Sequence, residues 1–326
     1  MQDEHRTRAH GYAAFPKDRD LTVSDGTRIA YTVRGDDGGL PVVFVNGWTC
    51  TDGYWASIGP ALVEAGHRTV FLDLRGHGES GLPRQAGFAA RGLRPEDLAP
   101  ERLAADVLEV LDHAGVEHAV LAGHSIGVEV IVETCRLAPH RVAALIPVAG
   151  TYENPVKTFA DLSILDRLFP FGDAILPFLP LEELRPVLRR IAVPGVARRF
   201  IQATGIGGPN VRDEDIASHM SHIGELNFSV LLKMLSGLRH HRTEEFLSEI
   251  DVPALILAGR RDWFTPPSVQ ERMAALIPGS EILWFEEAGH LLPVEAAAEI
   301  PAAIVDFLSR RVVGARPRSP RNVPAG

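Results

Sequence analysis

Cysteine is scarce in this chain, and several other features are missing altogether. The 326 residues include only Cys50 and Cys135 and no C-x-x-C pair, which excludes a disulfide framework and a cysteine-based zinc module. A reducing compartment fits this usage. No apolar core of signal-peptide type follows Met1, and no apolar run approaches the ~18 residues of a membrane span. We therefore expect a cytoplasmic protein without a membrane span.

Positive charge is also in short supply over most of the chain. The net charge is −9, and five of the 33 basic residues are arginines at or beyond Arg310, where no acidic residue occurs. An acidic body argues against nucleic acid as the partner. The basic tail could meet an anionic surface, but a frayed chain end is the simpler interpretation.

What is present is ordinary globular composition with a regular pattern. Hydrophobic residues make up 45% and charged residues 23%, so a large core is available. Short β-branched runs alternate with longer helical patterns, and Asp25-Gly26 separates the first two runs as a hairpin turn would. This alternation predicts an α/β fold with a mostly parallel, doubly wound sheet.

The alternation stops in the middle of the chain and then resumes. Residues 151 to about 250 are rich in Phe, Leu and Pro, with helical stretches and no clear strand, so we expect a helical cap inserted after the sixth strand. The expected organisation is a flexible segment at 1–19, a core domain at 20–150 and 251–309, the cap at 151–250, and a disordered basic tail at 310–326.

The sharpest motif is Gly123-His-Ser-Ile-Gly127, which follows an expected strand and opens an expected helix. That context is the one a G-x-S-x-G nucleophile elbow requires. The turn is so tight that side chains at Gly123 and Gly127 would collide, and it would lift the Ser125 hydroxyl above the sheet edge. The motif predicts Ser125 as a nucleophile and the Ile126 N–H as an oxyanion donor.

A serine nucleophile needs a base that is itself held by an acid. His290 follows the last expected strand and Asp262 follows the strand before it, so both lie in loops at the carboxyl edge of the sheet. We expect His290 to take the Ser125 proton and Asp262 to orient the imidazole. Glu153 is the rival acid.

A second oxyanion donor has to come from the loop after another strand. The apolar run that begins at Val42 ends in Asn46-Gly47-Trp48. Gly47 permits a close approach, and Trp48 would donate its N–H while its ring lines the pocket. Packing of Trp48 in the core is the alternative, and both can hold at once.

Together these motifs resemble those of the α/β-hydrolase superfamily, in particular its capped serine carboxylesterases. The resemblance spans about residues 20 to 309 and includes the specific run Asp73-Leu-Arg-Gly-His-Gly-Glu-Ser80. In the family that loop is mainly structural, so His77 is not expected to be catalytic. Two departures stand out: Asn46 replaces the usual His before Gly47, and Val128 and Glu129 follow Gly127 where a small residue is usual. Glu129 either tunes the site or supports the helix start.

The resemblance implies hydrolysis of an ester through an acyl-enzyme, with no cofactor and no metal. The apolar, aromatic stretch of the cap favours a small to medium hydrophobic acyl or aryl ester, although most of these side chains form the cap's own core. A serine nucleophile weighs against the related haloalkane dehalogenases and epoxide hydrolases, which use Asp, and the cap has no tyrosine beyond Tyr152. Lactone, amide or carbon–carbon bond hydrolysis, perhydrolysis and a non-catalytic receptor role stay open, as does the oligomeric state.

Further residues are candidates for the substrate pocket or for other sites. Cys50 is a candidate redox-sensitive thiol, although a buried structural cysteine is the simpler interpretation. The histidines of the cap lack carboxylates at metal-ligand spacing, so no metal site is expected there. The cap arginines could meet a substrate carboxylate but more often form solvated helix faces. The pocket candidates are Asn46, Gly47, His124, Phe169, Phe171 and Leu291, the histidines are His219, His222, His240 and His241, and the arginines are Arg189, Arg190, Arg198 and Arg199.

Overall fold

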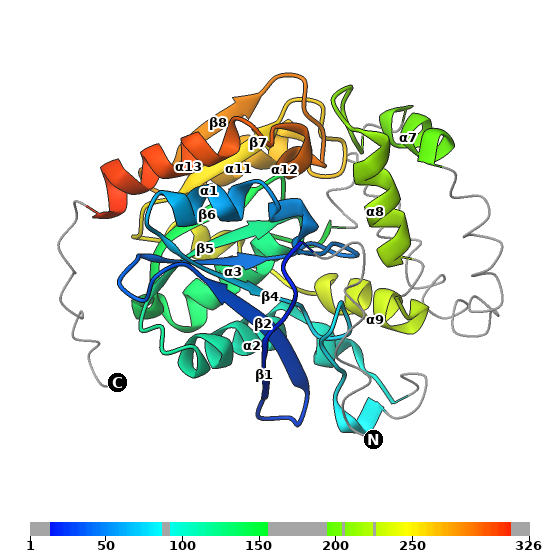
Figure 1. The fold of residues 1–326 in the computed structure, drawn as a ribbon, viewed down its shortest axis with the longest axis vertical. Coiled ribbons are helices and arrows are strands. Elements are labelled where there is room, and N and C mark those ends of the chain that lie inside the picture. The colour runs from blue at the N-terminus through cyan, green and yellow to red at the C-terminus, as the bar shows by residue number, and fades with distance from the viewer. Residues whose placement is uncertain (1–13, 87–91, 156–193, 204–205, 224–225, 314–326) are drawn as a thin grey trace.

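Eight strands form a single sheet in the order β1-β2-β4-β3-β5-β6-β7-β8 (Figure 1). The computed structural model describes residues 14–86, 92–155, 194–203, 206–223 and 226–313. Strand β2 pairs antiparallel with both β1 and β4, and every other neighbouring pair is parallel, as the sequence pattern predicts for most of the sheet. The strands are β1 (Arg19–Thr22), β2 (Arg28–Arg34), β3 (Pro41–Val45), β4 (Arg68–Leu72), β5 (Ala119–His124), β6 (Val142–Val148), β7 (Leu255–Gly259) and β8 (Glu281–Phe285).

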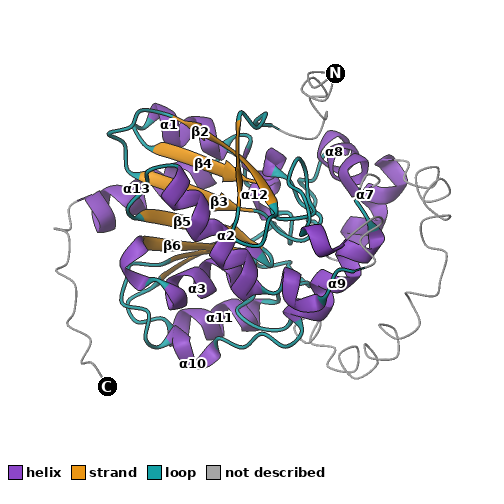
Figure 2. Ribbon diagram, turned by 90° about the horizontal axis from the view of Figure 1, so that it is seen from below, coloured by secondary structure: helices purple, strands orange, loops and turns teal. Residues whose placement is uncertain are grey.

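Helices cover both faces of this sheet (Figure 2). One face is covered by α1 (Ile58–Glu64) and α13 (Ile300–Leu308), together with the short 3-10 helix η1 (Asp52–Trp55) that precedes α1. Those of the other face are α2 (Pro100–His113), α3 (Gly127–Leu137) and α11 (Pro267–Leu276). Short elements link them: η2 (Arg84–Ala86), η4 (Pro95–Leu98), η5 (Pro139–Arg141), α12 (Leu292–Glu295) and η8 (Ser309–Val313).

The two layers create two hydrophobic cores, and single strands contribute to both. Successive side chains of a strand point to opposite faces of a sheet. In β3, Val43 and Val45 therefore pack with α2 and α3, whereas Val42 and Phe44 pack with α1 and α13. Continuous apolar strands are what a sheet covered on both faces requires.

The segment between β6 and β7, here called the insertion, is helical in its described residues. It contains α7 (Pro194–Ala203), α8 (Asp213–Ile223), α9 (Phe228–Leu238) and α10 (Glu244–Leu247), and an isolated bridge joins Glu153 to Arg242. Helices α7, α8 and α9 lie together beside the core (Figures 1 and 2). Among all the described helices, none is long and apolar enough to span a bilayer.

Two helices differ from the sequence expectation, and proline explains both. The pattern predicts one helix from Tyr54 to Ala65, but η1 ends at Trp55 and α1 begins at Ile58, two residues before Pro60. The pattern also predicts one helix from Val294 to Ser309, but the chain breaks after α12 and α13 begins just before Pro301. Because proline has no N–H and clashes with the preceding turn, each helix starts where its proline falls in the first turn.

The ends of the core domain are tied to it by ion pairs. Lys17 is buried and pairs with Asp52 and Asp73, although it lies in the stretch that we expected to be flexible. Near the other end, Arg310 and Arg311 both bind Glu281 of β8. The domain boundaries themselves stay predictions.

The loop after β4, Asp73 to Ser80, is held by its own polar groups. The Asp73 carboxylate accepts the Glu79 N–H at 2.9 Å, and the Ser80 hydroxyl donates to the Asp73 carbonyl at 2.7 Å. The buried Arg75 guanidinium forms two 2.6 Å bonds with Asp106 of α2. These contacts give the loop a structural role, because they fix β4 against α2.

His77 in this loop provides a test of how buried histidines affect stability. Burial lowers its pKa to about 4, and its Nε2 has no hydrogen-bond partner among the described residues. The unfolded chain, with an ordinary histidine pKa near 6.5, binds the proton first as pH falls, so stability is lost between pH 6.5 and 4. We expect His77→Gln to reduce the drop in unfolding free energy between pH 7.5 and 5 by about 2 kcal/mol. Urea denaturation at the two pH values measures it.

The exposed His140 supplies the matched control for this measurement. His140→Gln should leave the pH-dependent drop as it is in the unmodified protein. A His77→Gln protein that loses as much stability as the unmodified protein would show that His77 does not carry this dependence.

Candidate active site

The turn between β5 and α3 places Ser125 in a backbone conformation that side chains rarely adopt. Its φ is +56°, in the left-handed region. A Cβ on Gly123 would lie 2.4 Å from the Gly127 carbonyl oxygen, and one on Gly127 would lie 2.5 Å from the Val45 carbonyl oxygen. Both glycines are therefore required by the close approach of backbone to backbone, as the sequence motif indicates. The turn leaves the Ser125 side chain partly exposed at the end of β5.

His290 lies between Ser125 and Asp262. The distance from Ser125 Oγ to His290 Nε2 is 2.9 Å, and that from His290 Nδ1 to Asp262 Oδ2 is 3.0 Å. A carboxylate only accepts, so Nδ1–H donates to Asp262 and Nε2 is left to accept the hydroxyl proton. Because β7 and β8 are parallel neighbours, the loops that follow them meet at one edge of the sheet. The three residues that we proposed from the sequence are thus brought within hydrogen-bond distance.

The Asp262 carboxylate is held by the loop that begins with it. Oδ1 accepts the N–H groups of Phe264 and Thr265 at 2.8 and 2.9 Å, and Oδ2 accepts the Thr265 hydroxyl at 2.6 Å. These bonds fix the orientation of the carboxylate toward His290. The rival acid, Glu153, lies instead at the start of the insertion, where its backbone bridges to Arg242.

Two backbone N–H groups near Ser125 have no acceptor within the described residues: those of Trp48 and Ile126. A Cβ on Gly47 would lie 2.9 Å from the Ser125 Cβ, so only glycine allows the Trp48 loop to come this close. The indole Nε1 of Trp48 is also buried, and it has no hydrogen-bond acceptor among the described residues. This arrangement can stabilise negative charge that develops next to Ser125.

The other pocket candidates have specific contacts. The Asn46 amide accepts the Trp55 indole N–H at 2.8 Å, so this side chain braces η1. His124 donates from Nε2 to the His290 carbonyl oxygen at 2.9 Å, and Leu291 is buried against the insertion. Phe169 and Phe171, and likewise Arg189 and Arg190, lie outside the described residues.

A row of aromatic and sulfur groups packs beside the loop that carries His290. The Tyr54 ring stacks on His124 at 5.0 Å, and its hydroxyl lies 3.2 Å from Nδ1 of His219 in α8. Burial, and then the nearby His290, lower the pKa of His124 to about 3 and that of His219 to about 4. Burial raises the pKa of Cys50 to about 12, so the thiol stays protonated. These groups surround His290 without adding charge at neutral pH.

Sequence reasoning missed Glu295, which joins the His290 loop to the insertion. Its carboxylate accepts the Gly289 N–H at 3.1 Å and the Gly208 N–H at 2.7 Å. The His290 N–H donates to the Ile206 carbonyl oxygen at 2.9 Å, beside these bonds. Burial raises the pKa of Glu295 to about 7, although the two N–H groups lower it. Its position five residues after His290 was the only available sequence signal.

In the described part of the chain, the insertion's other charged candidates make their contacts with residues other than Ser125. His222 packs with its ring 6.1 Å from that of His77, His240 is exposed, and His241 lies between Glu129 and Glu133. Arg198 pairs with Asp213. Arg199 is exposed. Among the described residues, the Ser125 hydroxyl is bonded by His290 and by none of these candidates.

Comparison with known proteins places this fold and site in a family. Residues 41–297 match the model of the alpha/beta hydrolase fold, and the chain belongs to the α/β-hydrolase superfamily. Further relatives carry the names of carbamate and epoxide hydrolases. The expectation drawn from the sequence motifs is thereby confirmed at the level of the family and fold.

Three individual similarities show how distant the relatives are. The dihydrolipoyllysine-residue acetyltransferase component of an acetoin cleaving system from Pseudomonas putida is 28% identical over 85% of this chain, which spans only 65% of that longer protein. A pimeloyl-[acyl-carrier protein] methyl ester esterase from Methylococcus capsulatus is 28% identical over 78% of this chain and 88% of its own length. The structure of an esterase from Exiguobacterium antarcticum superposes with a TM-score of 0.69 at 21% identity, covering 89% of this chain and 98% of that one.

Proposed function

We propose that this protein is a serine hydrolase that cleaves a carboxylic ester through an acyl-enzyme intermediate. The observation that carries the proposal is the continuous line of hydrogen bonds from Ser125 Oγ through the His290 imidazole to Asp262. A hydroxyl, a base and an orienting acid in this geometry are the requirements for nucleophilic acyl transfer.

The proposed reaction has two steps at the same groups. Ser125 Oγ attacks the ester carbonyl while His290 Nε2 takes its proton, and the carbonyl oxygen becomes an anion beside the Trp48 and Ile126 N–H groups. His290 then returns the proton to the departing alcohol, which leaves an acyl group on Ser125. A water molecule, deprotonated by His290, hydrolyses that ester in the second step and restores the hydroxyl.

The nucleophile also separates this proposal from the epoxide hydrolase names among the relatives. Epoxide hydrolases of this family use an aspartate as the nucleophile, whereas this chain has Ser125 at the elbow. Esters are favoured over amides as the first substrates to test, because their alcohol leaving groups need less assistance from the general acid.

A series of p-nitrophenyl esters, from acetate to a long acyl chain, tests the proposal. We expect saturable hydrolysis with kcat/KM highest at one chain length, because an acyl pocket of fixed size fits one length best. A fluorophosphonate probe should label the protein in parallel. The proposal fails if no ester is hydrolysed and the probe does not react, an outcome that a binding protein with an inactive site would give.

A further inference from the structure

Helix α3 buries two carboxylates on one face, directly behind the nucleophile elbow. Glu129 and Glu133 are spaced i, i+4, and both are fully buried. Like charges at this spacing repel each other, and burial makes each charge costly unless a cation lies beside it. The imidazole of His241, which follows α9, lies between the two carboxylates. Its Nδ1 is 3.0 Å from Glu129 Oε2, and its Nε2 is 3.1 Å from Glu133 Oε2.

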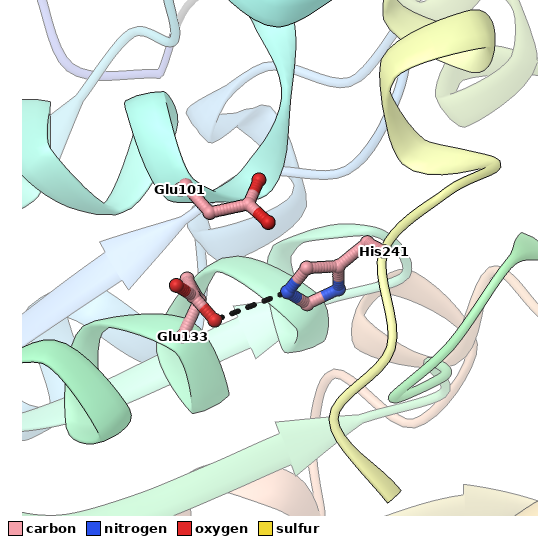
Figure 3. A group of neighbouring side chains, drawn as sticks. All are labelled: Glu101, Glu133 and His241. Atoms are coloured by element: carbon pink, nitrogen blue, oxygen red, sulfur yellow. Dashed lines mark hydrogen bonds and ion pairs between the residues drawn. The ribbon is translucent and has the colours of Figure 1, made fainter.

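A third carboxylate reaches the same place from a different helix. Glu101 lies in the first turn of α2, and Figure 3 shows its carboxylate extending toward the His241 ring. Single ligand atoms of Glu101, Glu133 and His241 all lie within 4.8 Å of one another. Glu101 is exposed and makes no hydrogen bond or ion pair within the described residues.

Two guanidinium groups, those of Arg136 and Arg242, supply positive charge near these carboxylates. The Arg136 side chain binds Glu133 through two bonds of 2.9 and 2.6 Å. Glu129 Oε1 is buried and has no hydrogen-bond partner among the described residues. The carboxylates of Glu101 and Glu133 therefore gather beside the His241 imidazole, and this set of oxygen and nitrogen ligands can hold a cation in place of a ring proton.

We propose that His241, Glu133 and Glu101 bind a divalent transition-metal cation of the Zn²⁺ type. One imidazole nitrogen and two carboxylate oxygens form a ligand set that Zn²⁺ accepts, with water at the remaining position. The cation takes the place of the proton between His241 Nε2 and Glu133. Ligand bonds of about 2.1 Å require the Glu101 carboxylate to move inward by roughly 1 Å, which its exposure permits.

Glu129 completes the site without touching the metal. Its carboxylate accepts the remaining ring proton from His241 Nδ1. This bond fixes the tautomer in which Nε2 is free to bind the cation. A carboxylate in this position is the usual support for a metal-binding histidine. The exposed Glu101 side gives the ion a path from solvent.

The location of the proposed metal site indicates that the cation would stabilise the structure and take no part in catalysis. His241 is adjacent to Arg242, whose backbone bridges to Glu153 at the point where the insertion leaves and rejoins the core. A cation here links α2, α3 and that junction. The inference stands on this geometry alone, so it is independent of the proposed ester chemistry.

Titration of the metal-stripped, full-length protein with Zn²⁺ tests the site. We expect one high-affinity ion per chain by calorimetry and a higher melting temperature in the presence of Zn²⁺. Glu101→Gln should weaken binding at least tenfold while the protein stays folded, because the native side chain is exposed and unpaired. Co²⁺ in place of Zn²⁺ should give a visible absorption band that this variant loses.

Glu117→Gln, which removes another exposed carboxylate near the end of α2, is the matched control and should bind as the unmodified protein does. The proposal is overturned if the unmodified protein takes up no stoichiometric Zn²⁺. It is equally overturned if Glu101→Gln and Glu117→Gln bind the ion alike, since the ion then lies elsewhere on the surface.

Discussion

Replacing Ser125 by alanine is expected to lower ester turnover roughly 10⁶-fold, by analogy with other serine triads. The loss is this large because the hydroxyl is both the attacking group and the carrier of the acyl intermediate. Its partners, His290 and the Trp48 and Ile126 N–H groups, remain in place but have no nucleophile to activate. Alanine fits the elbow because only Oγ is removed, so the melting temperature should change little.

The measurement is kcat/KM on the best p-nitrophenyl ester, together with fluorophosphonate labelling. Ser280→Ala is a matched control, since Ser280 bonds the Ala274 carbonyl oxygen beside β8. It should keep full activity and full labelling. A Ser125→Ala protein that retains most of its turnover would refute the acyl-enzyme mechanism, whichever ester is used.

Replacing Asp262 by asparagine is expected to lower kcat about 10⁴-fold, the size of effect seen when a triad acid loses its charge. The surrounding bonds explain how. Two N–H groups point at the Oδ1 position, so the asparagine oxygen is held there and its NH₂ group faces His290 Nδ1. The imidazole then takes the tautomer with its proton on Nε2, and Nε2 can no longer accept the Ser125 proton.

Glu153→Gln is the matched control, because Glu153 is the other acid that the sequence offers. It should leave kcat and the pH profile unchanged. If Glu153→Gln were the variant with the large loss and Asp262→Asn retained activity, the acid would be assigned wrongly. Measuring both on one ester separates the two assignments.

The sequence indicated the fold and the main residues of the site because both depend on local patterns. The alternation of apolar runs and helical stretches predicted the parallel sheet, and Gly123 and Gly127 predicted the sharp turn. Strand order then placed Asp262 beside His290, because loops after neighbouring parallel strands meet at one edge. None of these inferences needs knowledge of how distant side chains pack.

What the sequence missed depends on contacts between distant segments. Glu101, Glu133 and His241 meet only because α2 packs on α3 and the insertion returns over both. No spacing along the chain encodes that meeting, and the cap histidines alone suggested no metal ligand. Glu295 was missed for the same reason, since its role depends on Gly208 in the insertion. The breaks before α1 and α13 were missed because apolar periodicity continues across them.

The two bonds that join the His290 loop to the insertion limit how this protein can be recombined with its relatives. The imidazole is anchored through its own backbone to Ile206, and Glu295 binds Gly208 on the same stretch. A chimera that received its insertion from another hydrolase would need a carbonyl and an N–H at these two points. Without them, Glu295 would keep only the Gly289 N–H as a donor, and the His290 backbone would lose its bond to the insertion. The insertion of this protein is therefore coupled to the loop that carries His290.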